Sequence, residues 1–188
     1  MKRVSENFER CVDWISFRPE CWELAKPIAV DRGEVAKNYP RHAEYDRGAK
    51  QSDAVLIGAL GEIVIPEYFT ARGIKFKMTK LVAASPQRGY DILVQEPFKE
   101  SFNVKSSWDA ASDYLVNTES HYKSTVDFYL FMKLRGPKGT TEATIWILPH
   151  VVVDDWEPNK RTPTPTLHRP CSEVEWMFHR FQYANRSV

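Results

Sequence analysis

The sequence predicts an α/β domain built around a central mixed sheet of five strands, flanked by helices. Three observations lead to this prediction. A long apolar stretch with helical character begins near residue 53, several segments between residues 74 and 148 have the apolar patterns of strands, and turn-forming residues separate these segments. The expected order is one helix, three strands, a second helix and two strands, which favours the α/β class.

The first core element is a helix over residues 53–69. Asp53 can cap its N-terminus, and Gly73 follows shortly after its last apolar residue. Pro66 lies inside this helix. Because proline has no N–H to donate to the carbonyl group four residues earlier, which belongs to Glu62, we expect a bend at this point.

Alternation and turns define the remaining core elements. Along residues 101–108, side chains alternate between two faces, so Asn103 and Lys105 are expected on one face, opposite to Phe102. Residues 126–134 are apolar on both faces, which predicts a buried central strand. The expected strands are residues 74–78, 90–95, 101–108, 126–134 and 143–148, and the expected second helix is residues 110–123.

The whole chain, residues 1–188, is expected to form a single domain. Its core spans about residues 53–153, with an N-terminal arm of residues 1–52 and a C-terminal arm of residues 154–188. Hydrophobic residues make up 43% of the chain and aromatic residues 13%, which suits one packed core and excludes a disordered chain.

The two arms have different textures. Residues 5–26 are expected to form a helix that is interrupted by prolines and ends before Pro27, and residues 31–50 are polar and rich in turn formers. In the C-terminal arm, closely spaced prolines favour an extended chain. Residues 172–186 begin with a Ser-x-x-Glu capping box and are predicted to form a last helix.

Charge and cysteine content exclude several classes of protein. The chain has 26 basic and 25 acidic residues, so its formal net charge of +1 argues against a histone-like or polybasic protein. Cys11, Cys21 and Cys171 form no CxxC pair, so neither a disulfide framework nor a thiolate zinc site is expected. No signal peptide or membrane span is recognisable, and we therefore expect a cytoplasmic protein without a membrane partner.

Four polar residues stand out in the core: Glu62 in the apolar helix, where it follows eight uncharged residues, Asp91 at the second strand, and Asn103 with Lys105 on the third. Each alone has an ordinary structural explanation, namely a solvated glutamate, a turn aspartate or a lysine reaching out from a strand edge. Together they supply what phosphodiester hydrolysis needs, which is a set of oxygen ligands for a divalent cation and a positive charge beside the attacking water.

The roles of these residues follow from their chemistry. Asp91, the Asn103 amide oxygen and the Val104 carbonyl oxygen can form a ligand set for magnesium. Lys105 can orient or deprotonate the attacking water, or hold the charge of the phosphate. Glu62 can bind metal-coordinated water or a second ion. The hairpin between the second and third strands is expected to place Asp91 beside Lys105.

Three segments carry these residues in order: Gly-Ala-Leu-Gly-Glu62, Tyr-Asp91 and Phe-Asn-Val-Lys105-Ser. The apolar strand VDFYLFMKL follows them. In this order they resemble the PD-(D/E)xK nuclease superfamily over about residues 53–150. The resemblance implies a restriction-endonuclease-like fold in which Glu62, Asp91 and Lys105 take the places of the family's helix-borne acid, Asp and Lys. It also implies a Mg²⁺-dependent DNA endonuclease, with Mn²⁺ as a substitute, that leaves a 5′-phosphate and a 3′-hydroxyl.

Asn103 departs from the family's pattern, because Glu or Gln usually stands there. One negative charge is therefore missing from the implied metal site, and an amide oxygen binds Mg²⁺ more weakly than a carboxylate does. An alternative is thus a catalytically inactive nuclease-fold protein that binds nucleic acid or a protein partner. A small-molecule hydrolase is a third, weaker alternative, since no glycine-rich phosphate loop supports it.

Substrate contacts are expected around the second strand. Residues 72–88 contain five basic residues and no acidic one, and this charge can follow the phosphate backbone of double-stranded DNA, although a solvated strand face and loop explain it equally well. Cutting of both strands at one site would favour a homodimer. His121 can approach the site, but a packing role fits it better. The candidate substrate-binding residues are Lys77, Lys80, Gln87, Arg88 and Ser106.

Overall fold

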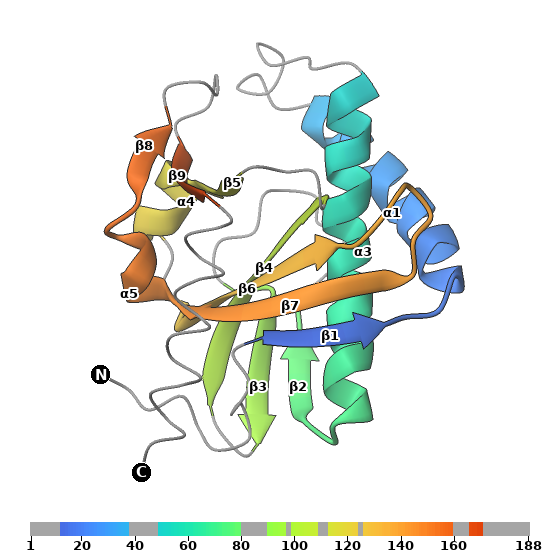
Figure 1. Cartoon of the computed structure of the whole chain (residues 1–188), viewed down its shortest axis with the longest axis horizontal. Helices are drawn as coiled ribbons and strands as arrows, with labels where there is room; N and C mark the ends of the chain where they lie inside the picture. Colours follow the sequence, from blue (N-terminus) through green and yellow to red (C-terminus); the bar gives the residue numbers. More distant parts are fainter. Residues whose placement is uncertain are drawn as a thin grey trace.

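The computed structural model describes residues 12–37, 49–79, 90–96, 99–108, 113–123, 126–159 and 166–170 of the chain. Within these residues, a six-stranded sheet has the order β1-β7-β6-β4-β3-β2 (Figure 1). Its strands are β1 (Val12–Ser16), β2 (Lys75–Met78), β3 (Ile92–Glu96), β4 (Glu100–Trp108), β6 (Phe128–Leu134) and β7 (Glu142–Pro149). β4 and β6 are parallel and all other neighbours are antiparallel. The predicted α/β class and mixed sheet are confirmed, with six strands in place of five.

β1 is the strand of the six-stranded sheet that was not predicted from the sequence. Residues 5–26 were expected to be helical, but within the described residues Val12–Ser16 pair antiparallel with β7, and the helix begins only at Glu20. Ile15 is buried in the core, whereas Trp14 beside it is 59% exposed. This alternation is that of an edge strand with one buried face, and pairing with β7 outweighs a local helical tendency.

Two long helices, α1 (Glu20–Lys37) and α3 (Ala49–Ala71), pack against each other beside the sheet (Figure 1). α1 continues through Pro27, where the predicted helix ends, and α3 begins before Asp53, which is therefore not its cap. Each proline inside a helix removes one backbone hydrogen bond. Both helices nevertheless continue, because tertiary packing supplies most of the stability of a helix in a folded protein.

β6 is buried on both faces, as predicted. Phe128, Leu130 and Met132 belong to a first core that also contains the buried residues of α1 and α3. Tyr129 and Phe131 belong to a second core on the opposite face of the sheet. Alternate residues of β6 therefore pack into the two cores on opposite faces of the same sheet.

A smaller layer covers the second core (Figure 1). It consists of the sheet β5-β9-β8 and two short helices, and it buries Val116 and Leu167. Within the described part of the predicted helix over residues 110–123, residues 113–117 are a strand because they pair with β9, whereas residues 118–123 are helical as predicted. The predicted last helix, residues 172–186, lies outside the described residues. The elements are β5 (Asp113–Asn117), α4 (Thr118–Lys123), α5 (His150–Val153), β8 (Glu157–Asn159) and β9 (Thr166–Pro170).

The stretch Asp53–Ala71 of α3 is long and apolar enough to cross a membrane by composition, with a mean hydropathy of 1.5. Ala59, Leu60 and Ile65 within it are fully buried in the first core. Burial of this kind is what the core helix of an α/β domain also shows.

Candidate active site

Asp91 immediately precedes β3 and lies beside β4. Its backbone N–H donates to the Phe102 carbonyl at 2.9 Å, and its carbonyl accepts from the Thr79 N–H at 3.0 Å. Its side-chain Oδ2 accepts a hydrogen bond from the backbone N–H of Val104 at 2.7 Å. Oδ1 accepts no hydrogen bond from any residue that the structure describes. The Val104 N–H thus holds the carboxylate beside β4, and the other carboxylate oxygen can bind another group.

Asn103 and Lys105 lie on the same face of β4, as alternation predicts. Phe102 and Val104, which alternate with them along the strand, point to the opposite face and are buried in the first core. The Lys105 Nζ donates to the Asn103 Oδ1 at 3.2 Å. Burial lowers the pKa of Lys105, while the charges of Asp91 and Glu62 oppose that change. Lys105 is therefore an amine close to two carboxylates and only partly accessible to water.

Gly61 explains how Glu62 comes close to this strand. A Cβ atom at position 61 would lie 1.9 Å from the Ser106 Oγ and 3.3 Å from a methyl carbon of Val104. Only a residue without a side chain allows α3 to pack this closely on β4. Because Glu62 is the next residue, this close packing brings its carboxylate to the same end of the site as Asp91 and Lys105.

Arg32 of α1 holds both oxygens of Glu62. Its Nη1 donates to Oε1 at 2.9 Å and its Nη2 to Oε2 at 2.5 Å, which is the bidentate geometry that guanidinium and carboxylate favour. Burial raises the pKa of Glu62, and the negative charge of Asp91 adds to this effect, whereas Arg32 and Lys105 oppose it. Sequence reasoning missed Arg32, because the predicted helix ended before Pro27 and the residues after it were assigned to turns.

The four charged groups form one electrostatic cluster. Burial raises the pKa of Asp91, and Lys105, the Val104 N–H and Arg32 oppose the increase. Glu62 lies on α3, Asp91 before β3 and Lys105 on β4, so three separate elements contribute to the cluster. Because the negative charge of Asp91 also raises the pKa of Glu62, an additional cation placed near the two carboxylates would lower the electrostatic energy.

The donor atoms of this cluster suit a hard divalent cation such as Mg²⁺ or Mn²⁺. Asp91 has an oxygen without a hydrogen bond among the described residues, and Asn103 offers an amide oxygen. The Val104 carbonyl and the Glu62 carboxylate are the other oxygen donors predicted for the site. Oxygen donors of these types are the ligands that Mg²⁺ and Mn²⁺ prefer. The chemistry of the residues present therefore fits such an ion.

The predicted substrate-binding residues divide into three groups. Lys77 lies on β2 with an exposed side chain. The Ser106 hydroxyl is buried against α3 at Gly61 and has no hydrogen-bond partner among the described residues, so it does not face solvent. Lys80, Gln87 and Arg88 lie outside the described residues.

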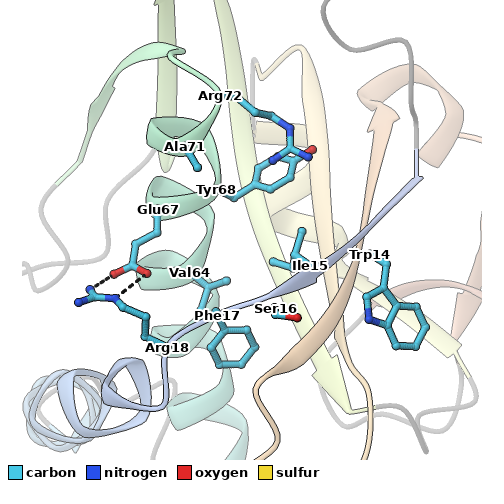
Figure 2. A pocket seen from close by; sticks show the side chains of 10 residues that line it. All are labelled: Trp14, Ile15, Ser16, Phe17, Arg18, Val64, Glu67, Tyr68, Ala71 and Arg72. Atoms are coloured by element: carbon cyan, nitrogen blue, oxygen red, sulfur yellow. Dashed lines mark hydrogen bonds and ion pairs between the residues drawn. The ribbon is translucent and has the colours of Figure 1, made fainter.

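A separate pocket of about 450 Å³ lies between β1 and α3 (Figure 2). Trp14, Glu67 and Arg72 contribute to its lining, and none of the predicted catalytic residues does. Arg18 forms an ion pair with Glu67, and the Arg72 guanidinium lies 3.8 Å from the centre of the Tyr68 ring. Arg18, Glu67 and Arg72 thus each contact another residue of the pocket lining, and the pocket is distinct from the candidate active site.

No protein-family model matches the chain, and no curated protein matches it in sequence. Inference about function therefore depends on the geometry and chemistry of the residues themselves.

We expect the ion pair between Arg32 and Glu62 to stabilise the fold by about 1–3 kcal/mol, since its side chains are mostly buried. Arg32 is 26% exposed and Glu62 16% exposed. The measurement is a double-mutant cycle with Arg32→Ala and Glu62→Gln, in which the free energy of unfolding in urea is determined for each variant. The cycle isolates the pair from other contacts of either residue.

The pair Arg18–Glu67 is the matched control, because it also links the chain at the start of α1 to α3. Its side chains are 64% and 34% exposed, so solvent screens the interaction and a smaller coupling energy is expected. Equal coupling energies in the two cycles would contradict a special role for the buried pair.

Proposed function

We propose that the chain is a Mg²⁺-dependent DNA endonuclease of restriction-endonuclease-like fold, with Glu62, Asp91, Asn103 and Lys105 in its active site. The observation that carries the proposal is the convergence of Glu62, Asp91 and Lys105 from three elements into one partly buried cluster. Charged side chains are costly to bury, and buried clusters of them are found mainly where chemistry or binding requires them.

The order of elements gives further support. An acid-bearing helix, α3, precedes Asp91, which lies immediately before β3, and Lys105 lies on the next strand, β4, which is parallel to β6. This is the order that the resemblance implies. The expected substrate is double-stranded DNA, and the exposed Lys77 remains a candidate for contact with its phosphates.

In the proposed mechanism, Asp91, the Val104 carbonyl and Asn103 would hold the cation, with Glu62 binding through its carboxylate or through water. When bound, Mg²⁺ supplies a Lewis acid for the phosphate and lowers the pKa of coordinated water. Lys105, which Asn103 orients through its amide oxygen, positions the attacking water, helps to remove its proton or stabilises the charge on the phosphate. Burial lowers the pKa of Lys105, which makes its neutral form more accessible for accepting a proton.

The experiment that tests this proposal is incubation of the purified protein with supercoiled and linear double-stranded DNA in Mg²⁺, Mn²⁺, Ca²⁺ or EDTA. We expect nicked or linear products with Mg²⁺ and Mn²⁺ and none with EDTA. The cleaved ends should carry a 5′-phosphate, which ligation without prior kinase treatment detects. Absence of cleavage with every metal and DNA form, together with intact folding, would overturn the proposal.

A second candidate function is binding of nucleic acid or a protein partner without catalysis. Two observations favour it: Arg32 occupies both oxygens of Glu62, and Asn103 brings no negative charge. This function predicts DNA binding that weakens with salt and no metal-dependent turnover.

Asn103→Glu is expected to raise the affinity for divalent cations by about tenfold or more, since it adds a second carboxylate beside Asp91. The measurement is the Mg²⁺ concentration that gives half-maximal cleavage, together with Ca²⁺ binding by calorimetry. Asn103→Gln is the matched control, because it has the same length as Glu without the charge. Equal Ca²⁺ affinities of the Glu and Gln variants would show that position 103 does not contribute to a cation site.

A further inference from the structure

His121, His150 and Asp154 form a second cluster of potential ligands, in which the donor atoms lie within 4.8 Å of one another. His121 lies on α4 and is fully buried, His150 is the first residue of α5, and Asp154 follows the end of α5. The His121 Nε2 is 2.8 Å from the Asp154 Oδ1. The two imidazole rings stack with their centres 4.1 Å apart. None of these residues belongs to the candidate active site.

One ring nitrogen of each histidine is held by a group that is not a proposed ligand atom. For His150 this leaves Nδ1, and for His121 it leaves Nε2, which contacts Asp154. The His150 Nε2 lies 3.2 Å from the His121 carbonyl oxygen, and because a carbonyl only accepts, this nitrogen carries the proton and Nδ1 has the lone pair. The His121 Nδ1 lies 2.9 Å from the Tyr129 hydroxyl. When that nitrogen is protonated, the lone pair of Nε2 points toward Asp154. Hydrogen bonds of this kind commonly orient metal-binding histidines.

We propose that His121, His150 and Asp154 bind a first-row transition-metal ion of the zinc type. Two imidazoles and one carboxylate form a ligand set that zinc prefers, with a fourth position left for water. The 2.8 Å between the His121 and Asp154 donor atoms is close to the separation of about 3.3 Å between two ligands around a tetrahedral zinc ion. The ion takes the place of the proton that Nε2 otherwise shares with the carboxylate, and the ligand atom of His150 lies within 4.8 Å of both other ligand atoms.

The surroundings of the cluster support this site. Asp154 is 48% exposed, so an ion can enter from solvent.

The site would link α4 to the segment at α5, both of which lie beside the second core. Tyr129, which contacts both histidines, pairs with Asn103 in the register of β6 and β4. A bound ion would therefore fix the layer that packs on the same sheet face as Asn103 and Lys105. The ion would be independent of the Mg²⁺ proposed at Asp91.

The test uses the full chain without a histidine tag, freed of metal with EDTA and dialysed. Titration with Co²⁺ should produce the visible absorption of a tetrahedral ion at one equivalent, and calorimetry with Zn²⁺ should give the same stoichiometry. Zn²⁺ at a hundredfold excess over its Kd should raise the Tm by about 5 to 10 °C. None of these readouts depends on DNA cleavage, so failure of the proposed nuclease activity leaves the result interpretable.

His150→Gln and Asp154→Asn are expected to weaken Co²⁺ and Zn²⁺ binding by about 100-fold. Asp155→Asn, at the neighbouring exposed position, should bind these ions as the wild type does. Circular dichroism and the Tm without metal confirm that the variants are folded. Absence of stoichiometric Co²⁺ binding by the wild type, or unchanged binding by both ligand variants, would overturn the proposal in favour of a hydrogen-bonded Asp–His–Tyr group without an ion.

Discussion

Lys105→Met and Asp91→Asn are each expected to lower Mg²⁺-dependent cleavage of supercoiled DNA by about 10³-fold. Lys105→Met keeps most of the aliphatic stem and removes the amine that Asn103 orients. Asp91→Asn keeps an oxygen that can accept the bond from the Val104 N–H but removes the charge needed to hold a cation. The initial rate of nicking at saturating Mg²⁺ is the measurement.

Lys99→Met and Asp155→Asn are the matched controls, because both positions are exposed and neither belongs to the cluster. They should cleave at the wild-type rate. The Tm of each active-site variant should remain close to that of the wild type, which separates loss of chemistry from loss of folding. Full activity in either active-site variant would exclude the proposed roles of these two residues.

Gly61→Ala is expected to destabilise the fold by about 1–3 kcal/mol and to slow cleavage by about 10²-fold. The added methyl group would overlap the Ser106 Oγ at 1.9 Å and crowd its Cβ at 3.2 Å, so the hydroxyl must rotate away and α3 must shift slightly from β4. The shift moves Glu62 relative to Lys105, and small displacements of reacting groups have large effects on rate. Urea unfolding and the cleavage rate provide the two measurements.

Gly58→Ala is the control on the same helix. A Cβ atom there meets nothing within 4 Å, so the substitution should stabilise the helix by about 0.5–1 kcal/mol without changing cleavage. If Gly61→Ala behaved like Gly58→Ala in both assays, the close packing of α3 on β4 would not be what places Glu62.

Local patterns predicted the central strands correctly. The two-residue period of a strand is a property of the backbone, and it predicted that Asn103 and Lys105 share one face of β4. The continuous apolar sequence of β6 predicted that both of its faces are buried. Prediction failed where distant contacts compete with local preference. Residues 12–16 and 113–117 became strands because β7 and β9 offer pairing partners, and α1 passes Pro27 because it packs on α3.

The candidate site shows the same division. The residue types at positions 62, 91, 103 and 105 and the chemistry they can perform are evident from the sequence, since charge and ligand preference belong to each side chain. Their convergence, the hold of Arg32 on Glu62, and the meeting of His121 with His150 and Asp154 were decided only by the tertiary structure. These contacts join residues far apart in the chain, and no local pattern records which of them burial will bring together.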